Sequence, residues 1–218
     1  EKYIDQGYPD SILTTDSADL FAAKPDIFID VSGPVEPGLQ MSREMLEQGV
    51  HVVSANKQAI ATGGKALLDL VEQSSAKMLF SSAAGGGMPV LEMCIREKGR
   101  IARVEALLNG TTNFMLGEMD AGMSYDDALK IAQDRGYAEA DPTSDVDGHD
   151  AAAKIRLVSL LGFGVELTPE QIERDTLAGV EAKLKPGTIL KRVARVSGDT
   201  GSIVADLRLR ALSPNNFL

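Results

Sequence analysis

The chain has 218 residues, of which 44% are hydrophobic and 25% are charged, as is usual for a globular protein with a sizeable core. Its formal net charge of −10 argues against nucleic acid as a partner, because nucleic-acid-binding surfaces carry an excess of Lys and Arg. The single cysteine, Cys94, excludes a disulfide within the chain and fits the reducing cytoplasm, and no apolar run reaches the roughly 18 residues of a membrane span, so we expect no membrane partner.

The first part of the chain alternates predicted strands with predicted helices. The strands are 27–31, 50–54 and 78–80, and the helices are about 37–48 and 64–73. This alternation predicts a parallel sheet. Ligands bind beyond the carboxyl ends of strands in such sheets. The segments at those ends are Ser32-Gly33, Ala55-Asn56-Lys57 and 81–87.

From residue 85 the pattern changes to a mixture of helices and antiparallel strands. The predicted helices are 89–97, 124–135, 150–162 and one beginning at Thr168, and the predicted strands are 101–108, 189–196 and 203–209. A turn at 197–201 joins the last two strands into a hairpin. Ile203, Ala205 and Leu207 alternate with Asp206 and Arg208, which indicates a strand with one buried face. The chain is therefore predicted to be α/β, with a parallel-sheet region followed by an α+β region.

The densest group of charged residues lies between residues 139 and 154, and its members are Glu139, Asp141, Asp145, Asp147, Asp150 and Lys154. Asp150 and Lys154 share one face of a predicted helix. A lysine held beside carboxylates can exchange a proton with a substrate hydroxyl, and carboxylates can hold a substrate ammonium group. From spacing alone, an acidic loop that caps a helix and carries an exposed ion pair is the favoured interpretation. A calcium loop is excluded, because Lys154 would stand where the bidentate glutamate is needed.

Two other motifs have an ordinary and a functional interpretation. Lys57 follows a strand end, where a ligand would lie, but most such lysines are simply exposed. Gly85-Gly86-Gly87 suits close backbone approach to a ligand, although a tight turn is the better explanation. Neither a phosphate-binding loop nor a Gly-x-Gly-x-x-Gly dinucleotide fingerprint is found in the sequence.

The string GYAEADPTSDVDGHDAAAK, residues 136–154, resembles the signature of the homoserine dehydrogenase family. Three further motifs resemble family landmarks in the same order, namely SANK at 54–57, GGGMP at 85–89 and LNGTTNF at 108–114, and the similarity runs from about residue 26 to the end. The resemblance implies reduction of aspartate 4-semialdehyde to homoserine with a hydride from NADP or NAD in its reduced form. This reaction belongs to threonine and methionine biosynthesis.

The resemblance also implies roles for individual residues. Lys154 would be the catalytic proton donor, Asp150 would support it, and Lys57 would lie between nicotinamide and substrate. The residues that would bind the substrate are Glu139, Asp145, Gly136 and Lys57. Those that would contact the cofactor are Ser32, Gly33, Asn56 and Lys57. A monovalent cation such as sodium would be bound by the backbone carbonyls of Ala84, Gly86 and Met88.

The sequence departs from the family pattern in two places. Ser81 stands where several members carry a glutamate cation ligand, and the first strand with its glycine-rich cofactor loop is missing. We therefore expect residues 1–84 to be the C-terminal part of a partial Rossmann-like nucleotide-binding domain, and residues 85–218 to be a catalytic and dimerisation domain. A homodimer or homotetramer is expected. Two alternatives stay open: a related small amino-acid dehydrogenase, and a catalytically silent relative.

Overall fold

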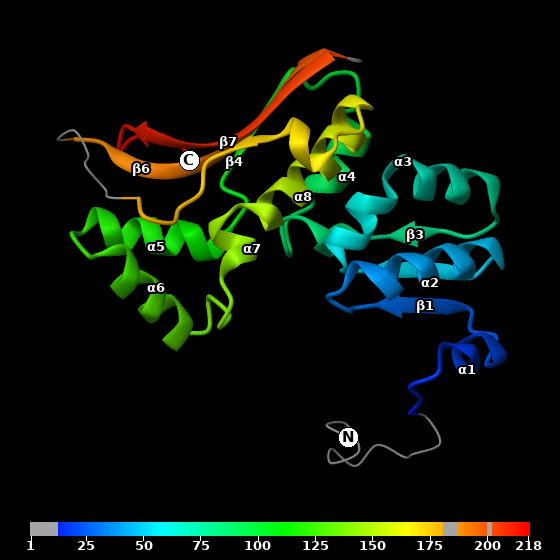
Figure 1. Cartoon of the computed structure of the whole chain (residues 1–218). Coiled ribbons are helices and arrows are strands. Elements are labelled where there is room, and N and C mark those ends of the chain that lie inside the picture. Colours follow the sequence, from blue (N-terminus) through cyan, green and yellow to red (C-terminus); the bar gives the residue numbers. More distant parts are fainter. Residues whose placement is uncertain (1–12, 181–186, 200–201) are drawn as a thin grey trace.

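The computed structural model describes residues 13–180, 187–199 and 202–218. Figure 1 shows two parts side by side, with the early strands and helices in one and the long hairpin of β6 and β7 in the other. The early part contains a three-stranded parallel sheet, and the later part contains a four-stranded mixed sheet. The predicted α/β class, with a parallel sheet followed by an α+β region, is confirmed.

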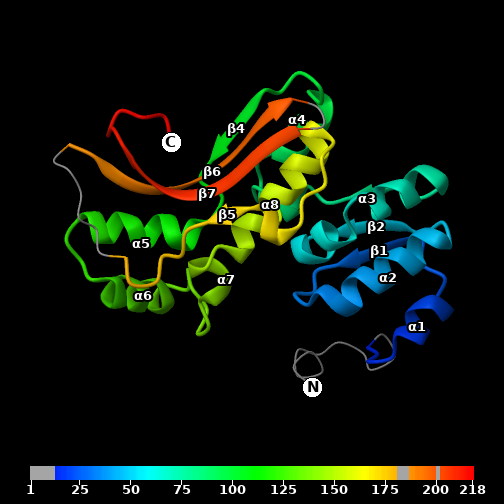
Figure 2. The same ribbon diagram turned by 45° about the horizontal axis from the view of Figure 1, so that its top comes forward.

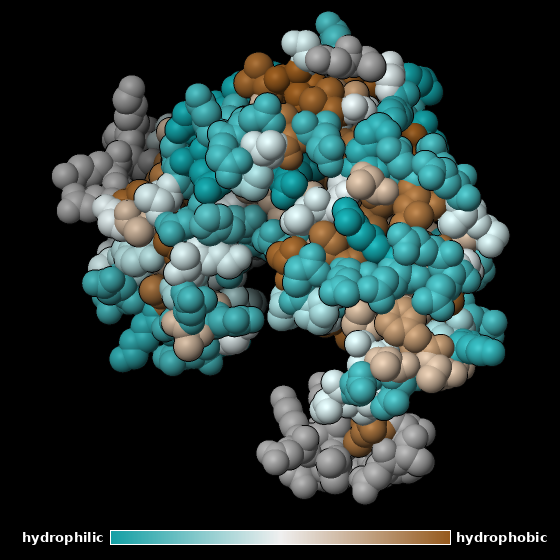
Figure 3. All heavy atoms as spheres, turned by 45° about the vertical axis from the view of Figure 1, so that its right-hand side comes forward, coloured by the Kyte–Doolittle hydropathy of each residue, from teal (hydrophilic) through white to brown (hydrophobic). Residues whose placement is uncertain are grey.

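The parallel sheet has the strand order β1-β2-β3, formed by Ile27–Asp30, His51–Ser54 and Met78–Leu79. Its helices are α1 (Ser17–Ala22), α2 (Val35–Glu47) and α3 (Lys57–Gln73). Val52 and Ser54 face the core, whereas Ile29 and Leu79 are each more than half exposed on the opposite face of the sheet. Figure 3 shows that hydrophobic residues reach the surface of the molecule in several separate patches.

Helix α3 begins earlier than the sequence predicts. Asn56 is its N-cap, and the side-chain oxygen of Asn56 accepts a hydrogen bond from the Ala59 backbone N–H at 3.1 Å. Gly64, where the helix was expected to begin, instead interrupts it with a φ of +45°. The prediction was wrong because a glycine pair in mid-helix has the same sequence signal as a helix boundary. As a result Lys57 lies in the first turn of a helix and not in a loop.

The mixed sheet has the order β4-β6-β7-β5, formed by Arg103–Ala106, Ile189–Asp199, Ser202–Leu212 and Glu173–Arg174. β6 and β7 pair antiparallel, as predicted, although residues 200 and 201 of the predicted turn lie outside the described residues. The helices of this part are α4 (Val90–Arg96), α5 (Gly110–Asp120), α6 (Tyr125–Asp134), α7 (Thr143–Val146) and α8 (His149–Val158). Single turns occur at Ser81–Ala83 and Pro169–Gln171, and α8 continues as a π-helical turn over Ser159–Phe163.

Three elements of this part differ from the prediction. Residues 110–120 form α5, where no helix was expected, because Gly110, Thr111 and Thr112 are poor helix formers and hide the start of the helix. Its N-cap Asn109 and its buried Met115 and Leu116 stabilise it instead. The short helix α7 was expected to be a loop, and the helix expected from Thr168 is only one 3-10 turn.

Helix α8 is the centre of the fold. It packs on α3 from one part and on β6 from the other, as Figure 2 also shows. Its alanine-rich face allows close approach, and Ile155, Leu157 and Val158 are fully buried in the main core. A second, smaller core lies between α5 and α6. Within the described residues, no helix is both long enough and apolar enough to cross a membrane.

Candidate active site

Two lysines converge on one buried carboxylate at the start of α8. The Nζ atom of Lys154 lies 2.8 Å from Oδ2 of Asp150, and the Nζ atom of Lys57 lies 3.1 Å from Oδ1 of the same side chain. Lys154 also donates a hydrogen bond of 2.7 Å to the carbonyl oxygen of Leu108. The third N–H of Lys154 has no partner among the described residues, so it is available to a substrate oxygen.

The surroundings of Asp150 keep its carboxylate ionised. Burial alone would raise the pKa of Asp150, but the positive charge and hydrogen bond of Lys154, the hydrogen bond of Asn109 and the charge of Lys57 together hold that pKa below its ordinary value. The ionised carboxylate lies within ion-pair distance of both lysine ammonium groups. A charged ammonium group is thus held in a partly enclosed site, which is the arrangement that proton donation to an alkoxide requires.

Asp145 joins the same group through Asn109. Asn109 Nδ2 donates hydrogen bonds to Asp145 Oδ1 at 2.6 Å and to Asp150 Oδ2 at 3.1 Å. Asp145 is half-buried at the end of α7, close to the positions of Asp150 and Lys154. The structure therefore brings together four of the predicted or implied site residues, and these come from α3, α7 and α8.

Glu139 and Gly136 lie in the segment between α6 and α7. Glu139 is exposed, and no hydrogen bond or ion pair joins its carboxylate to another described residue. Its backbone carbonyl accepts a hydrogen bond from Gln133 at 3.1 Å. Gly136 ends α6 with a φ of +74°, a conformation that favours glycine. The structure therefore does not join Glu139 to the group formed by Asp145 and Asp150, although all three residues lie in the same stretch of sequence.

The predicted cofactor residues form a second polar group at the carboxyl ends of β1 and β2. Asn56 Nδ2 donates to the Ser32 hydroxyl at 3.2 Å and to the Pro34 carbonyl at 2.7 Å, and Ser32 donates to Asp30 at 2.7 Å. Beside Gly33 there is open space, since a Cβ atom added there would meet nothing within 4 Å. The parallel-sheet edge thus offers polar groups and room for a ligand, as the sheet topology predicts.

The residues of the predicted cation loop follow β3. Gly85 and Gly86 both have positive φ values, and the Met88 carbonyl accepts a hydrogen bond from the Val90 N–H at 2.8 Å. The Ser81 hydroxyl donates a hydrogen bond to the Glu92 carboxylate. Among the described residues, no group of three or more His, Cys, Asp or Glu side chains is placed to hold a metal ion.

Sequence reasoning missed two residues of the site. Asn109 was noted only as part of a motif, and Arg192 was not singled out. Arg192 is buried on the core-facing side of β6, where its guanidinium donates to the carbonyl oxygens of Asp145 and Val146. The strand pattern could have identified Arg192, because it shares a strand face with Ala194 and Val196. A cation on a buried face needs hydrogen-bonding partners.

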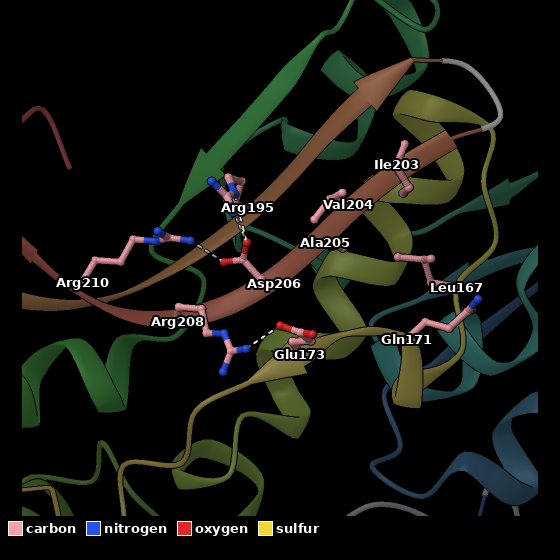
Figure 4. Close-up of a pocket in the computed structure, with 10 residues that line it drawn as sticks. All are labelled: Leu167, Gln171, Glu173, Arg195, Ile203, Val204, Ala205, Asp206, Arg208 and Arg210. Carbon is pink, nitrogen blue, oxygen red and sulfur yellow. Dashed lines mark hydrogen bonds and ion pairs between the residues drawn. The ribbon is translucent and has the colours of Figure 1, made fainter.

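A hollow of about 640 Å³ lies on the opposite face of the β6–β7 hairpin and contains neither Lys154 nor Asp150. Its arginines are already paired: Arg195 and Arg210 contact Asp206 at 2.6 and 2.7 Å, and Arg208 contacts Glu173, as Figure 4 shows. Arginines that are already paired with carboxylates attract an anionic ligand only weakly. We therefore assign the chemistry to the Lys154 group and not to this hollow.

Comparison with known families agrees with this geometry. Residues 89–218 match the sequence model of the family described as homoserine dehydrogenase, and residues 2–81 match the model described as its NAD binding domain. The chain belongs to the homoserine dehydrogenase family. The similarity to the family begins at residue 2, earlier than the motifs alone indicated.

Individual family members support the same conclusion. A homoserine dehydrogenase of Synechocystis is 35% identical over an alignment of 212 residues, which covers 93% of this chain and 49% of that protein. The structure of a homoserine dehydrogenase from Thiobacillus denitrificans superposes with a TM-score of 0.85 at 28% identity, covering 94% of this chain and 50% of that one. A hyperthermophilic archaeal homoserine dehydrogenase in complex with NADPH gives a TM-score of 0.80 at 28% identity, covering 94% and 62%. The chain spans about half the length of the curated relatives it matches.

Proposed function

We propose that this chain carries the substrate-binding half of a homoserine dehydrogenase active site, together with part of the cofactor-binding half. The reaction is the reduction of aspartate 4-semialdehyde to homoserine. The observation that carries the proposal is the Asp150 carboxylate, which holds the ammonium groups of Lys57 and Lys154 on its two oxygens. A pair of fixed cations beside an ionised carboxylate suits stabilisation and protonation of an alkoxide.

In the proposed reaction Lys154 is the proton donor. A bound nicotinamide dinucleotide supplies the hydride to the aldehyde carbon. Lys154 directs its free N–H at the aldehyde oxygen, stabilises the negative charge that develops there and transfers a proton to it. Asp150 and the Leu108 carbonyl hold the ammonium group in place during this step. Lys57 provides a second positive charge next to the reacting oxygen.

Asp145 and Glu139 are proposed to bind the amino group of the substrate, with the Gly136 turn shaping the segment that carries Glu139. The half-buried Asp145 carboxylate has one oxygen on Asn109, and no hydrogen bond or ion pair among the described residues involves its other oxygen. A substrate ammonium between Asp145 and Glu139 would balance two carboxylates that form no ion pair with another described residue.

Ser32, Gly33, Asn56 and Lys57 are proposed to contact the cofactor. The open space at Gly33 and the exposed Ser32 fit a large ligand at the sheet edge, and they support this assignment. The cofactor is NAD or NADP. We further propose residues 1–84 and 85–218 as the two domains, since the two family models meet between residues 81 and 89.

The proposal is tested by Lys154→Ala in the full-length protein. We expect kcat to fall by at least about a hundredfold, which is a typical loss of general acid–base catalysis. Lys65→Ala is the matched control, because Lys65 pairs with Asp69 four residues away on an exposed part of α3, so its removal should leave kcat unchanged. Near-normal turnover of Lys154→Ala would refute the role.

The same assay separates the alternatives. Aspartate 4-semialdehyde and a panel of related aldehydes are compared with NADH and NADPH. Preference for another aldehyde would favour a related small amino-acid dehydrogenase, and no turnover of any aldehyde by the unmodified protein would favour a catalytically silent family member.

A monovalent cation is proposed at the backbone carbonyls of Ala84, Gly86 and Met88. The positive φ values of Gly85 and Gly86 support it, since they turn successive carbonyls of a short loop. Activity in sodium chloride should exceed activity in choline chloride at equal ionic strength. Equal activity in the two salts would argue against the cation.

A homodimer or homotetramer is proposed through the outer face of the mixed sheet. Val204 is 61% exposed there, beside the Asp206 ion pairs, and an uncovered sheet face with both apolar and paired charged groups suits an interface. Light scattering of the full-length protein should give a mass of at least two subunits, and Val204→Arg should lower it. A monomeric mass for the unmodified protein would rule this out.

A further inference from the structure

We infer that Asn109 is a positioning residue that sets the spacing between the substrate-binding carboxylate Asp145 and the carboxylate that holds the catalytic lysine, Asp150. The inference rests on the proposed function of Asp145, Asp150 and Lys154. Asn109 belongs to the motif at 108–114, to which neither the sequence nor the family comparison assigns a task. It precedes α5 and lies buried between α5, α7 and α8.

Every hydrogen-bonding position of the Asn109 side chain is occupied. The two N–H groups of Nδ2 donate to Asp145 at 2.6 Å and to Asp150 at 3.1 Å. Oδ1 accepts from the backbone N–H and from the hydroxyl of Thr112, both at 2.9 Å. The opposite orientation of the amide would place Oδ1 against two carboxylates. The amide is therefore fixed with its donors toward the acidic pair.

The chemistry of an amide explains why this residue type suits the position. A carboxamide supplies two donors at a fixed separation and carries no charge. It can thus hold two carboxylates near one another without neutralising either. A lysine or arginine at residue 109 would form an ion pair with Asp145 and compete with a substrate ammonium. Asn109 leaves Asp145 ordered and still negatively charged toward the substrate.

Arg192 contacts the residues that surround Asn109. Its guanidinium donates to the Thr112 hydroxyl at 3.3 Å and to the Val146 carbonyl at 2.6 Å, and it also contacts the Asp145 carbonyl. One buried cation therefore joins the start of α5 to α7. Asp145 and Asp150 lie on α7 and α8, and the Asn109 amide bonds to both carboxylates, so a change at Asn109 acts on their spacing.

The residue before Asn109 contributes to the same arrangement. The Leu108 carbonyl accepts the 2.7 Å hydrogen bond from Lys154 Nζ. Two successive residues of the crossover from β4 to α5 thus contact the proton donor, its supporting carboxylate and the ammonium-binding carboxylate. This short segment sets the geometry of both ends of a small substrate.

The helix cap and the carboxylate bridge use different atoms of Asn109, so they can be separated by substitution. Asn109→Asp has the same shape and keeps an oxygen that accepts the Thr112 N–H, but it loses both donors. The new carboxyl group faces Asp145 and Asp150, so thermal unfolding must first show that the variant is folded under the assay conditions. In the full-length enzyme we expect kcat/KM for aspartate 4-semialdehyde to fall by about tenfold to a hundredfold, with KM raised and kcat lowered.

The Asn109→Asp variant has a characteristic pH profile. When the introduced carboxyl group is protonated it can donate one hydrogen bond, so kcat/KM of the variant should recover as the pH is lowered, unlike that of the unmodified enzyme. The charged groups that face this position are Asp145 from α7, Asp150 and Lys154 from α8, Lys57 from α3 and Arg192 from β6. A purely structural role of Asn109 would leave the shape of the profile unchanged.

Asn113→Asp is the matched control. Asn113 lies one turn further along α5, and its Oδ1 accepts from Lys191 Nζ at 2.7 Å, away from the acidic pair. The same change of amide to carboxylate there should leave kcat/KM within about twofold of the unmodified enzyme, because it touches neither Asp145 nor Asp150.

A second measurement does not depend on turnover. Carbon-detected NMR titration of Asp150 should give a higher pKa in Asn109→Ser than in the unmodified protein, because Ser retains a capping oxygen but removes a donor to Asp150. If the unmodified protein reduces no aldehyde, the proposed function fails while the titration still decides the bridge. An Asp150 titration unchanged in Asn109→Ser, or an Asn109→Asp enzyme with unchanged kcat/KM and pH profile, would overturn the inference.

Discussion

Lys57 and Asp150 meet although they belong to different parts of the fold. Lys57 lies in the first turn of α3, beside the parallel sheet, and its Nζ atom is 3.1 Å from Oδ1 of Asp150 on α8. The contact places the carboxyl edge of the parallel sheet next to the acidic segment. A ligand bound at that edge would therefore lie beside Lys154, which contacts the other oxygen of Asp150.

Asp150→Asn should destabilise the fold by about 1–3 kcal/mol at pH 7, because it weakens hydrogen bonds from two charged partners. The pKa of Asp150 is lower in the folded chain than the unfolded value of about 3.9, so the ionised carboxylate stabilises the fold above about pH 4, and this contribution is lost as the pH falls toward the folded pKa. Urea unfolding should show the difference at pH 7 and a smaller one at pH 3. Asp69→Asn, which affects only an exposed pair, is the control. Equal stability of Asp150→Asn at pH 7 would contradict the prediction.

Gly148→Ala should destabilise the fold by about 2–4 kcal/mol. Gly148 is the N-cap of α8 with a φ of +80°, and an added Cβ would come within 2.7 Å of the Leu207 side chain. Gly99 has nearly the same φ, +79°, but its Cβ would meet nothing within 4 Å. Gly99→Ala should therefore cost only the backbone strain, about 1–2 kcal/mol. If thermal unfolding shows equal losses of stability for the two variants, the contact with Leu207 does not contribute to the cost of Gly148→Ala.

The fold could be predicted where local periodicity matched the final environment. The three parallel strands and the β6–β7 hairpin followed from apolar runs and alternation, because each buries one or two regular faces. Helix α5 could not be predicted, since its cap and its contacts with β6 stabilise a weak helix-forming sequence. Tertiary contacts outweighed local propensity there.

The site was only partly predictable for a related reason. Asp150 and Lys154 are four residues apart on one helix, so spacing predicted their contact correctly. The contact of Lys57 with Asp150 depends on the packing of α3 against α8, which no local pattern contains. Asn109 and Arg192 belong to the site through hydrogen bonds to residues far away in the sequence.

Cys94 should react slowly with thiol reagents in the folded protein. It is buried on α4, and burial raises the pKa of its thiol, so little reactive thiolate forms at neutral pH. Modification by a chromogenic disulfide at pH 8 should be at least about a hundredfold slower in buffer than in denaturing urea. Because Cys94 is the chain's single cysteine, Cys94→Ser provides the background rate. Rapid labelling of the native chain would show that α4 opens readily.

Arg192→Met should cost about 3–5 kcal/mol of stability, because the Asp145 and Val146 carbonyls lose their charged donor and keep only backbone N–H donors, while the site keeps its carboxylates. Desolvation lowers the pKa of Arg192, and the nearby Asp145 and Asp150 charges oppose this, so the guanidinium stays charged. Arg192→Lys should lose less stability than Arg192→Met, since lysine keeps the positive charge but not the forked donors of the guanidinium. Lys191→Met, the adjacent control, removes one hydrogen bond to Asn113 and should cost about 1 kcal/mol. Urea unfolding in which Arg192→Met is no less stable than Lys191→Met would show that the guanidinium does not hold α7 in place.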